Sequence, residues 1–408
     1  MNRSARGLVL FGLLLGIGAA AVTWILASRE PGSAGVLAAA AGRYFDPAFL
    51  ETGDRYHRTR LIALGVRGAV ILAVVWGAVL AARGGLPRGL SRIGGGRDWL
   101  ARLWVLTGMY LFLAVVRLPF SVFLVDRARR YGLRHDTWGE FFADWLRGMG
   151  IGWVLVAVVG LVVLGCFARF PRWGWAGAGA LVAVLSGLYA LFAPLVIDPL
   201  FNRIEPMEAS SLRDAVLETA RRGGVEAETV WVADASRRTR AVNAYVTGFG
   251  ATRRIVLYDT LVDTLPAEEV LLVVAHEAGH WRRHHLYKGL GLGVGAAMIG
   301  LFLAQGVLAR WRGGRPAGHP FLVLPAYALY VTAVFVTLPV ANTVSRAFEI
   351  EADRAALELT GDASTLISGK VRIAIENLSF VNPPRWVEVA LYTHPCTARR
   401  IAMAEAGP

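Results

Sequence analysis

Long apolar segments alternate with short polar ones along most of the chain. Seven of the apolar segments are close to the roughly 20 residues that a helix needs to cross a bilayer: residues 7–28, 61–82, 103–125, 148–168, 174–197, 289–308 and 320–341. The first follows Arg3 and Arg6 and is longer than the apolar core of a signal peptide, so we expect it to be retained. The pattern predicts a mainly α-helical integral membrane protein with seven transmembrane helices.

Two longer polar regions lie outside the predicted spans. Residues 198–285 separate the fifth and sixth spans, and residues 342–408 follow the seventh. Because spans six and seven form a hairpin, the two regions lie on one side of the membrane and can build one domain. We therefore expect a membrane domain (1–197), a first part of an extramembrane domain (198–285), a membrane hairpin (286–341) and a second part (342–408).

The first polar region has the periodicity of a small α+β domain. Residues 210–222 read as an amphipathic helix with serines at its start and glycines after its end. Residues 229–233, 243–249 and 254–258 are β-rich and bounded by turn residues. Pro266, Glu268 and Glu269 are typical of a helix start, and we expect that helix to run over 270–285 and to continue into the sixth span.

Composition supports the membrane assignment and removes other classes. Hydrophobic residues make up 55% of the chain and the formal net charge is +13. The arginines lie mostly between apolar segments, as the positive-inside bias predicts, so we expect no nucleic-acid partner. Cys166 lies within an apolar segment and Cys396 near the C-terminus. We therefore expect neither a disulfide framework nor a cysteine zinc site.

The strongest chemical signal is the sequence His-Glu-Ala-Gly-His at residues 276–280. On a helix, His276 and His280 share one face, so both imidazoles can reach a single zinc ion. Glu277 lies beside the first histidine and can act as general base on the attacking water. The motif predicts a zinc metalloprotease.

A third ligand is needed, and it does not follow directly after the motif. Leu286 stands where the metzincin pattern requires histidine, so that class is excluded. Glu349 and Asp353 share a face of a later predicted helix. Glu349 can bind zinc and Asp353 can accept the second N–H of a ligand histidine, whereas Glu351 is expected on the opposite, solvated face. By spacing alone, an ordinary charged helix face explains Glu349 equally well.

Two further groups carry weaker signals. His394, Arg399 and Arg400 are candidate donors to the oxyanion of a tetrahedral intermediate. His284 and His285 directly follow the motif helix. They are either spare ligands or a polar helix end at the membrane interface, and we favour the second reading.

These residues resemble the type I CAAX prenyl endopeptidases, which are seven-span membrane zinc proteases. The matching blocks are residues 197–202, 243–245, 254–261, 275–281, 345–353 and 394–401, with a looser match at 44–46. The chain departs from the family at Ala278, where leucine is usual, and at Cys396, where a second proline is common.

The resemblance implies a set of roles beyond those that the spacing supports. It implies Glu349 as the third ligand of one zinc ion, with His394 and Arg400 in the active site. It implies that Asn243, Ala244 and Tyr245 form an edge strand that pairs with the substrate backbone. It also implies a water-filled chamber between the helices and a catalytic domain that faces the cytoplasm.

We therefore expect a zinc metalloendopeptidase that acts on peptide or protein substrates, including prenylated CAAX C-termini, within a lipid bilayer. The arginine-rich loops favour a bacterial inner membrane. One alternative is a membrane-protein quality-control protease without prenyl specificity. Another is a non-catalytic, zinc-stabilised scaffold or transporter, for which Arg117 in the middle of a span is the motivation. The oligomeric state stays open.

Overall fold

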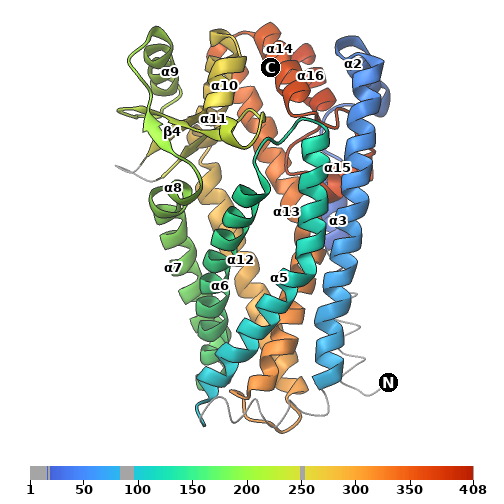
Figure 1. The fold of residues 1–408 in the computed structure, drawn as a ribbon, viewed down its shortest axis with the longest axis vertical. Helices are drawn as coiled ribbons and strands as arrows, with labels where there is room; N and C mark the ends of the chain where they lie inside the picture. Colours follow the sequence, from blue (N-terminus) through green and yellow to red (C-terminus); the bar gives the residue numbers. More distant parts are fainter. Residues whose placement is uncertain (1–15, 17–18, 83–95, 249–252, 408) are drawn as a thin grey trace.

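The computed structural model describes residues 16, 19–82, 96–248 and 253–407, and these are mostly helical. Figure 1 shows the long helices side by side, with the shorter elements gathered at one end. The helices that the structure describes and labels are α2 (Ala34–Tyr44), α3 (Pro47–Ala81), α5 (Asp98–Arg130), α6 (Trp138–Arg169), α7 (Gly174–Phe192), α8 (Asp198–Phe201), α9 (Ser211–Arg222), α10 (Asp259–Thr264), α11 (Ala267–Arg282), α12 (His285–Trp311), α13 (Val323–Thr360), α14 (Ala363–Glu376), α15 (Arg385–Leu391) and α16 (Thr397–Ala406).

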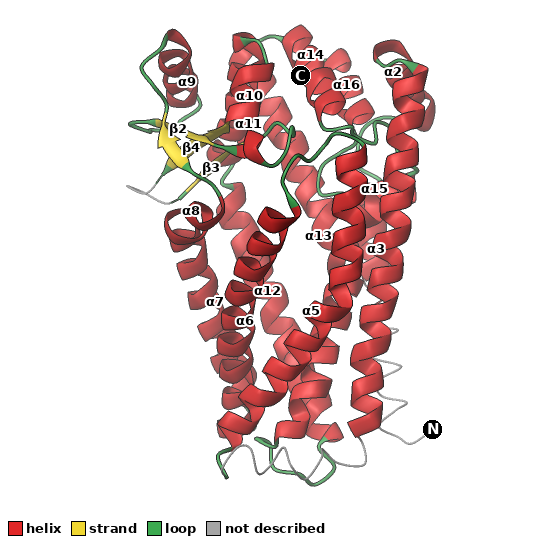
Figure 2. Ribbon diagram, in the orientation of Figure 1, coloured by secondary structure: helices red, strands yellow, loops and turns green. Residues whose placement is uncertain are grey.

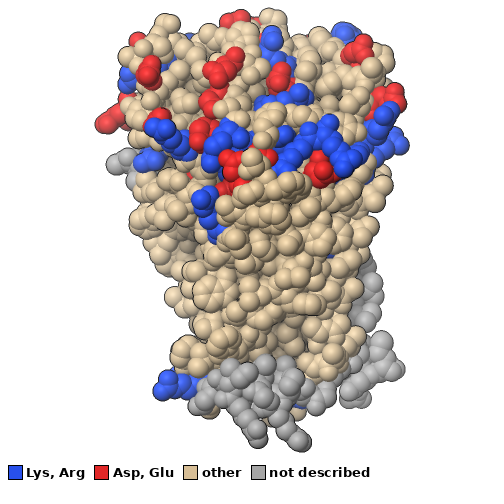
Figure 3. All heavy atoms as spheres, in the orientation of Figure 1, with Lys and Arg blue, Asp and Glu red and all other residues tan. Residues whose placement is uncertain are grey.

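Six helices within the described ranges are long and apolar enough to cross a membrane: α3, α5, α6, α7 with its continuation to Phe201, α12, and α13 with the short turn before it. They correspond to six of the seven expected spans. Half of the first, residues 7–28, lies outside the described residues. On the face drawn in Figure 3, charged side chains gather at the end with the short elements, and the helical body is largely uncharged. A body that faces lipid requires this distribution.

A small mixed sheet lies at the same end as the charged surface (Figure 2). Its described strands are β1 (Ile204–Pro206), β2 (Val230–Ala233), β3 (Ala244–Thr247) and β4 (Arg254–Tyr258), in the order β1-β2-β4-β3. β2 and β4 are parallel, and the other pairs are antiparallel. The buried face of the sheet packs on α9 and α11 through Val216, Val270 and Val274. β3 comes last in this strand order, so it is an edge strand among the described strands. It also contacts α11.

Most of the predicted elements of the small domain are confirmed. The helix expected at 210–222 is α9, and its Ser210 hydroxyl accepts a hydrogen bond from the Arg213 N–H. The expected strands correspond to β2, β3 and β4, although residue 249 of the middle one lies outside the described residues. β1 was not predicted, because three mostly exposed residues give no usable alternation.

Two helix boundaries differ from the expectation. The helix that begins after Pro266 does not continue into the sixth span, because His284 adopts a left-handed conformation (φ 57°, ψ 34°) and a new helix begins at His285. No glycine marks this break. Conversely, α13 runs without interruption from the apolar region to Thr360, so the expected domain boundary at 341/342 falls inside one helix. The residues of its last turns are thereby fixed rigidly to a membrane helix.

Candidate metal centre

The two histidines of the motif lie on the buried side of α11. Acidic residues in the first turn of this helix stabilise it by interacting with the positive end of the helix dipole. Its apolar residues pack against the sheet. His276 is buried and His280 is partly exposed. Their Nε2 atoms are 3.2 Å apart, so the helix directs both imidazoles to one point, as the i, i+4 spacing predicts.

The third candidate ligand, Glu349, comes from α13, which packs directly against α11. Close packing is possible because residue 279 is glycine: a Cβ there would lie 3.0 Å from both the Ala352 carbonyl oxygen and the Ala355 Cβ. At this crossing, Glu349 Oε2 lies 3.3 Å from His276 Nε2, and Glu349 Oε1 lies 3.2 Å from His280 Nε2. The structure therefore brings together the three ligands expected from the sequence.

The separations of these donor atoms fit a zinc ion. Ligands at about 2.0–2.1 Å from a tetrahedral zinc lie about 3.3 Å from one another. The two histidine Nε2 atoms are 3.2 Å apart, and each lies 3.2–3.3 Å from a different oxygen of Glu349, so the three side chains are close enough to share one ion. Glu349 Oε2 is also buried and has no hydrogen-bond partner among the described residues. A buried carboxylate oxygen left in this state is costly, and a cation at the meeting point of the three side chains satisfies it.

Asp353 holds His276 from behind. Its Oδ1 lies 2.8 Å from His276 Nδ1, so the proton of this imidazole resides on Nδ1 and the Nε2 lone pair faces the other ligands. Arg400 donates to both carboxylate oxygens of Asp353 at 2.6 Å, and Lys370 Nζ lies 3.3 Å from Oδ1. Lys370 was not predicted, because a lone lysine on an amphipathic helix carries no sign of its partner.

Glu277 is placed to act on water. Within the described residues its carboxylate has neither a hydrogen bond nor an ion pair, so it is free to accept a proton. Burial raises the pKa of the Glu277 carboxyl, and the neighbouring His276 and His280 only partly oppose this effect. A carboxylate with a raised pKa takes up a proton more readily at neutral pH.

The three candidate oxyanion donors, His394, Arg399 and Arg400, lie in different places relative to the metal site. His394 Nε2 lies 3.4 Å from Glu349 Oε1, and the side chain is 60% exposed, so it borders the open side of the site. Arg400 uses its Nε and one terminal nitrogen on Asp353, and its other terminal nitrogen lies 3.6 Å from Glu349 Oε2. The prediction for Arg399 is wrong, because its side chain is buried against Glu388 and points away from the metal ligands.

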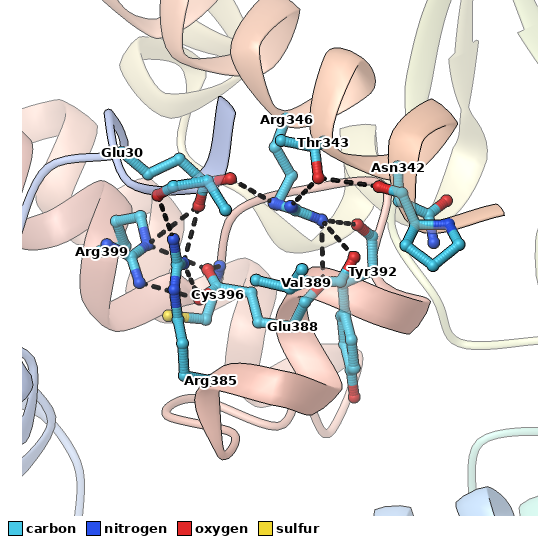
Figure 4. Close-up of polar contacts among 12 residues, drawn as sticks. Glu30, Asn342, Thr343, Arg346, Arg385, Glu388, Val389, Tyr392, Cys396 and Arg399 are labelled. Carbon is cyan, nitrogen blue, oxygen red and sulfur yellow. Dashed lines mark hydrogen bonds and ion pairs between the residues drawn. The ribbon is translucent and has the colours of Figure 1, made fainter. Parts of the chain in front are cut away.

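Figure 4 shows where Arg399 lies: a buried group of charges that joins the N-terminal region to the C-terminal one. Arg346, one helical turn before Glu349, donates to Glu30 at 2.8 Å. It also donates to three main-chain carbonyls at the end of α15, those of Glu388, Val389 and Tyr392. The segment that leads to His394 is thereby tied to the helix that carries Glu349. Arg346 is itself fully buried.

The expected substrate-binding residues lie along the open edge of the sheet. Asn243 directly precedes β3 and is exposed, whereas Ala244 is buried. The Tyr245 hydroxyl donates to Asp198 Oδ2 at 3.3 Å. Among the described strands β3 pairs with β4 alone, so within the described part of the chain its other edge is open to a further strand, beside helix α11.

Comparisons with known proteins agree with this geometry. The family model for peptidase family M48 matches residues 206–406, and the model for the CAAX prenyl protease N-terminal region, described as five membrane helices, matches residues 57–203. A CAAX prenyl protease 1 homolog from Oryza sativa subsp. japonica is 30% identical over 323 residues, which cover 75% of this chain and 73% of the relative. The uncharacterized metalloprotease YhfN of Bacillus subtilis is 29% identical over 302 residues, or 72% and 71% of the two chains.

A solved structure extends the likeness to the whole fold. The crystal structure of S. mikatae Ste24p superposes with a TM-score of 0.71 and 20% identity, and the match covers 99% of each chain. At this identity the likeness shows a shared fold. Together with the family matches, it shows that the chain belongs to peptidase family M48 and is a multi-pass membrane zinc metalloendopeptidase of the CAAX prenyl protease type.

Proposed function

We propose that a single zinc ion binds His276, His280 and Glu349, and that Glu277 is the general base. The observation that carries this proposal is that the two histidine Nε2 atoms lie 3.2 Å apart and that each lies 3.2–3.3 Å from an oxygen of Glu349. When bound, the ion supplies a Lewis acid for the scissile carbonyl and the attacking water. Glu277 then takes a proton from the water and passes it to the leaving amine.

The remaining residues bind and orient the substrate in this proposal. The extended substrate adds to the free edge of β3 at Asn243, Ala244 and Tyr245. Because the Asn243 carbonyl already accepts from the Tyr258 N–H of β4, the main-chain groups of Ala244 are the ones that face the substrate. His394, on the exposed side of Glu349, donates to the developing oxyanion. Arg400 acts mainly through Asp353, because two of its three nitrogens are already bound there.

The proposed substrate class is a prenylated CAAX C-terminus, cleaved by a catalytic domain that faces the cytoplasm of a bacterial inner membrane. The support is the relationship to proteins named CAAX prenyl proteases. The proposed domain division is a membrane part (1–197), two catalytic parts (198–285 and 342–408) and the hairpin that joins them (286–341).

A paired cleavage assay tests both the chemistry and the substrate. Purified full-length protein in detergent is incubated with a farnesylated CAAX peptide and with its unprenylated twin. We expect faster cleavage of the farnesylated peptide. Glu277→Gln should lower the rate by roughly 10²- to 10⁴-fold, whereas Glu268→Gln, an exposed glutamate in the first turn of the same helix, should leave it unchanged.

The outcomes separate the two parts of the proposal. Equal cleavage of both peptides that depends on Glu277 would keep the mechanism and replace prenyl recognition with a broad quality-control role. Full activity of Glu277→Gln would overturn the mechanism itself. Zinc bound by four protein ligands in the purified protein would instead support a structural metal site.

A further inference from the structure

His285, the first residue of α12, contacts the metal site although it lies outside the motif. Its Nδ1 is 2.9 Å from His280 Nδ1, and its Nε2 is 3.1 Å from Glu351 Oε2. The ring is buried and stacks on Phe348, with centroids 4.4 Å apart and an interplanar angle of 8°. Glu351 is 43% exposed, as expected of a solvated face, but it also pairs with His285, because the start of α12 packs against α13.

This contact depends on the break between α11 and α12. In a continuous helix, residues five positions apart differ by about 140° around the axis, so His280 and His285 would face different directions. The left-handed conformation of His284 removes this constraint. Such a conformation is strained for a non-glycine residue, and strain of this kind is retained where the surrounding structure fixes it.

The hydrogen bonds of the three side chains agree with one another. His280 presents its Nε2 lone pair to Glu349 and to the metal position, so its proton resides on Nδ1 and is donated to His285 Nδ1. His285 then carries its own proton on Nε2 and donates it to Glu351. The arrangement extends the direct Asp353–His276 contact by one imidazole, so each metal-binding histidine has a carboxylate behind it.

We propose that His285 and Glu351 are positioning residues that fix the orientation and tautomer of His280 as a metal ligand. The proposal rests on the zinc site proposed above and adds a second outer partner to it. Outer partners of ligand histidines are typically worth about 10- to 100-fold in metal affinity. The chain therefore contains two such supports, one direct from Asp353 and one through His285.

Zinc affinity, measured by competition with a chromogenic chelator on the full chain in detergent, tests the proposal. We expect His285→Ala to weaken binding about 10- to 100-fold and Glu351→Ala about 10-fold. Glu358→Ala is the matched control: Glu358 lies on the same helix, is 45% exposed against 43% for Glu351, and also pairs with a basic side chain. His284→Asn, which keeps a residue that tolerates the left-handed conformation, is the control for the neighbouring histidine. Both controls should bind zinc like the wild type.

Two readouts distinguish positioning from packing. When Co²⁺ replaces zinc, its visible absorption should be altered in His285→Ala and Glu351→Ala. The melting temperatures of the metal-free variants should stay near that of the metal-free wild type. His285→Gln, whose amide can accept from His280 and donate to Glu351, should lose less affinity than His285→Ala. The proposal would be overturned if His285→Gln and His285→Ala lost zinc affinity equally. It would also be overturned if His285→Ala kept the affinity and the Co²⁺ spectrum of the wild type. A wild-type chain that binds no zinc would instead overturn the metal site on which it rests.

Discussion

Two buried groups of charges lie close together on the same helices and differ in how completely they are paired. The metal-site cluster consists of His276, Glu349, Asp353, Lys370 and Arg400, and the hub consists of Glu30, Arg346, Arg385, Glu388 and Arg399. Both take residues from α13 and α16. Arg399 and Arg400 are adjacent in sequence, yet helical rotation sends one to each cluster.

The hub is satisfied by the protein alone, whereas the metal-site cluster is not. Arg346 donates from all three of its nitrogens, and Glu388 accepts from Arg385, Arg399 and the Cys396 N–H. In the other cluster, Glu349 Oε2 remains buried without a hydrogen-bond partner. The difference indicates that the hub stabilises the fold, while the metal-site cluster leaves one carboxylate oxygen available to bind a ligand.

The largest effect should come from removing the ligand with the unpaired oxygen. We expect Glu349→Gln to lower peptide cleavage by more than about 10⁴-fold, because the metal otherwise lowers the pKa of water from about 15.7 to about 7. The metal-free protein should change in unfolding free energy by no more than about 1 kcal/mol, since the lost ion pair with Arg400 spans 3.6 Å and Arg400 keeps both of its contacts to Asp353. Cleavage kinetics and thermal melting of the chelated protein check both halves. A large loss of stability would show that the clusters do not differ as described.

The opposite variant, Glu388→Gln, should act on stability. It leaves the buried Arg399 with the more distant Glu30, 3.8 Å away, as its charged partner, and breaking a buried ion pair costs about 3–5 kcal/mol. We expect a lower melting temperature and normal cleavage per folded molecule. Activity normalised to the folded fraction is the critical measurement. A loss of activity without a loss of stability would assign the hub to the chemistry instead.

The pKa of Glu388 predicts how this stabilisation depends on pH. Burial opposes ionisation, but hydrogen bonds from Arg399 and from the Cys396 N–H outweigh it and lower the pKa to about 2. Because the folded pKa lies below the usual value near 4.3, the contribution is complete above about pH 4.3 and is lost as the pH falls towards 2. The shift of roughly two units corresponds to at most about 3 kcal/mol.

Chelated wild type and Glu388→Gln, melted between pH 6 and pH 2, show this effect directly. The difference in their stabilities should be constant at the upper end and shrink towards the lower end. A difference that stays constant down to pH 2 would mean that Glu388 does not contribute through its charge.

The sequence predicts the features that depend on local pattern. The six described spans follow from length and hydropathy, and His276, Glu277 and His280 follow from helical spacing. Glu349 needed the family resemblance, because helical spacing finds a polar face but not the element opposite it. The hub could not be predicted at all: Glu30 and Arg346 are 316 residues apart, and a periodic pattern reports burial without naming a partner. The contact of His285 was missed because its cause, the left-handed His284, has no glycine to mark it.

The smallest expected effect comes from changing the distance between α11, which carries His276, and α13, which carries Glu349. Gly279→Ala places a methyl group 3.0 Å from the Ala352 carbonyl oxygen and the Ala355 Cβ, so α11 and α13 must separate slightly. Overpacking of this kind costs about 1–3 kcal/mol. Because Glu349 and His276 lie on opposite sides of this contact, zinc affinity should fall together with stability.

Gly289→Ala provides the control, since a Cβ at this position in α12 meets nothing within 4 Å. Alanine there should be neutral or stabilise the helix by up to about 1 kcal/mol. If Gly279→Ala lowers stability and leaves zinc affinity unchanged, the metal ligands tolerate a change in helix separation. In that case their geometry is set by the partners behind them, Asp353 and His285, rather than by the contact between the helices.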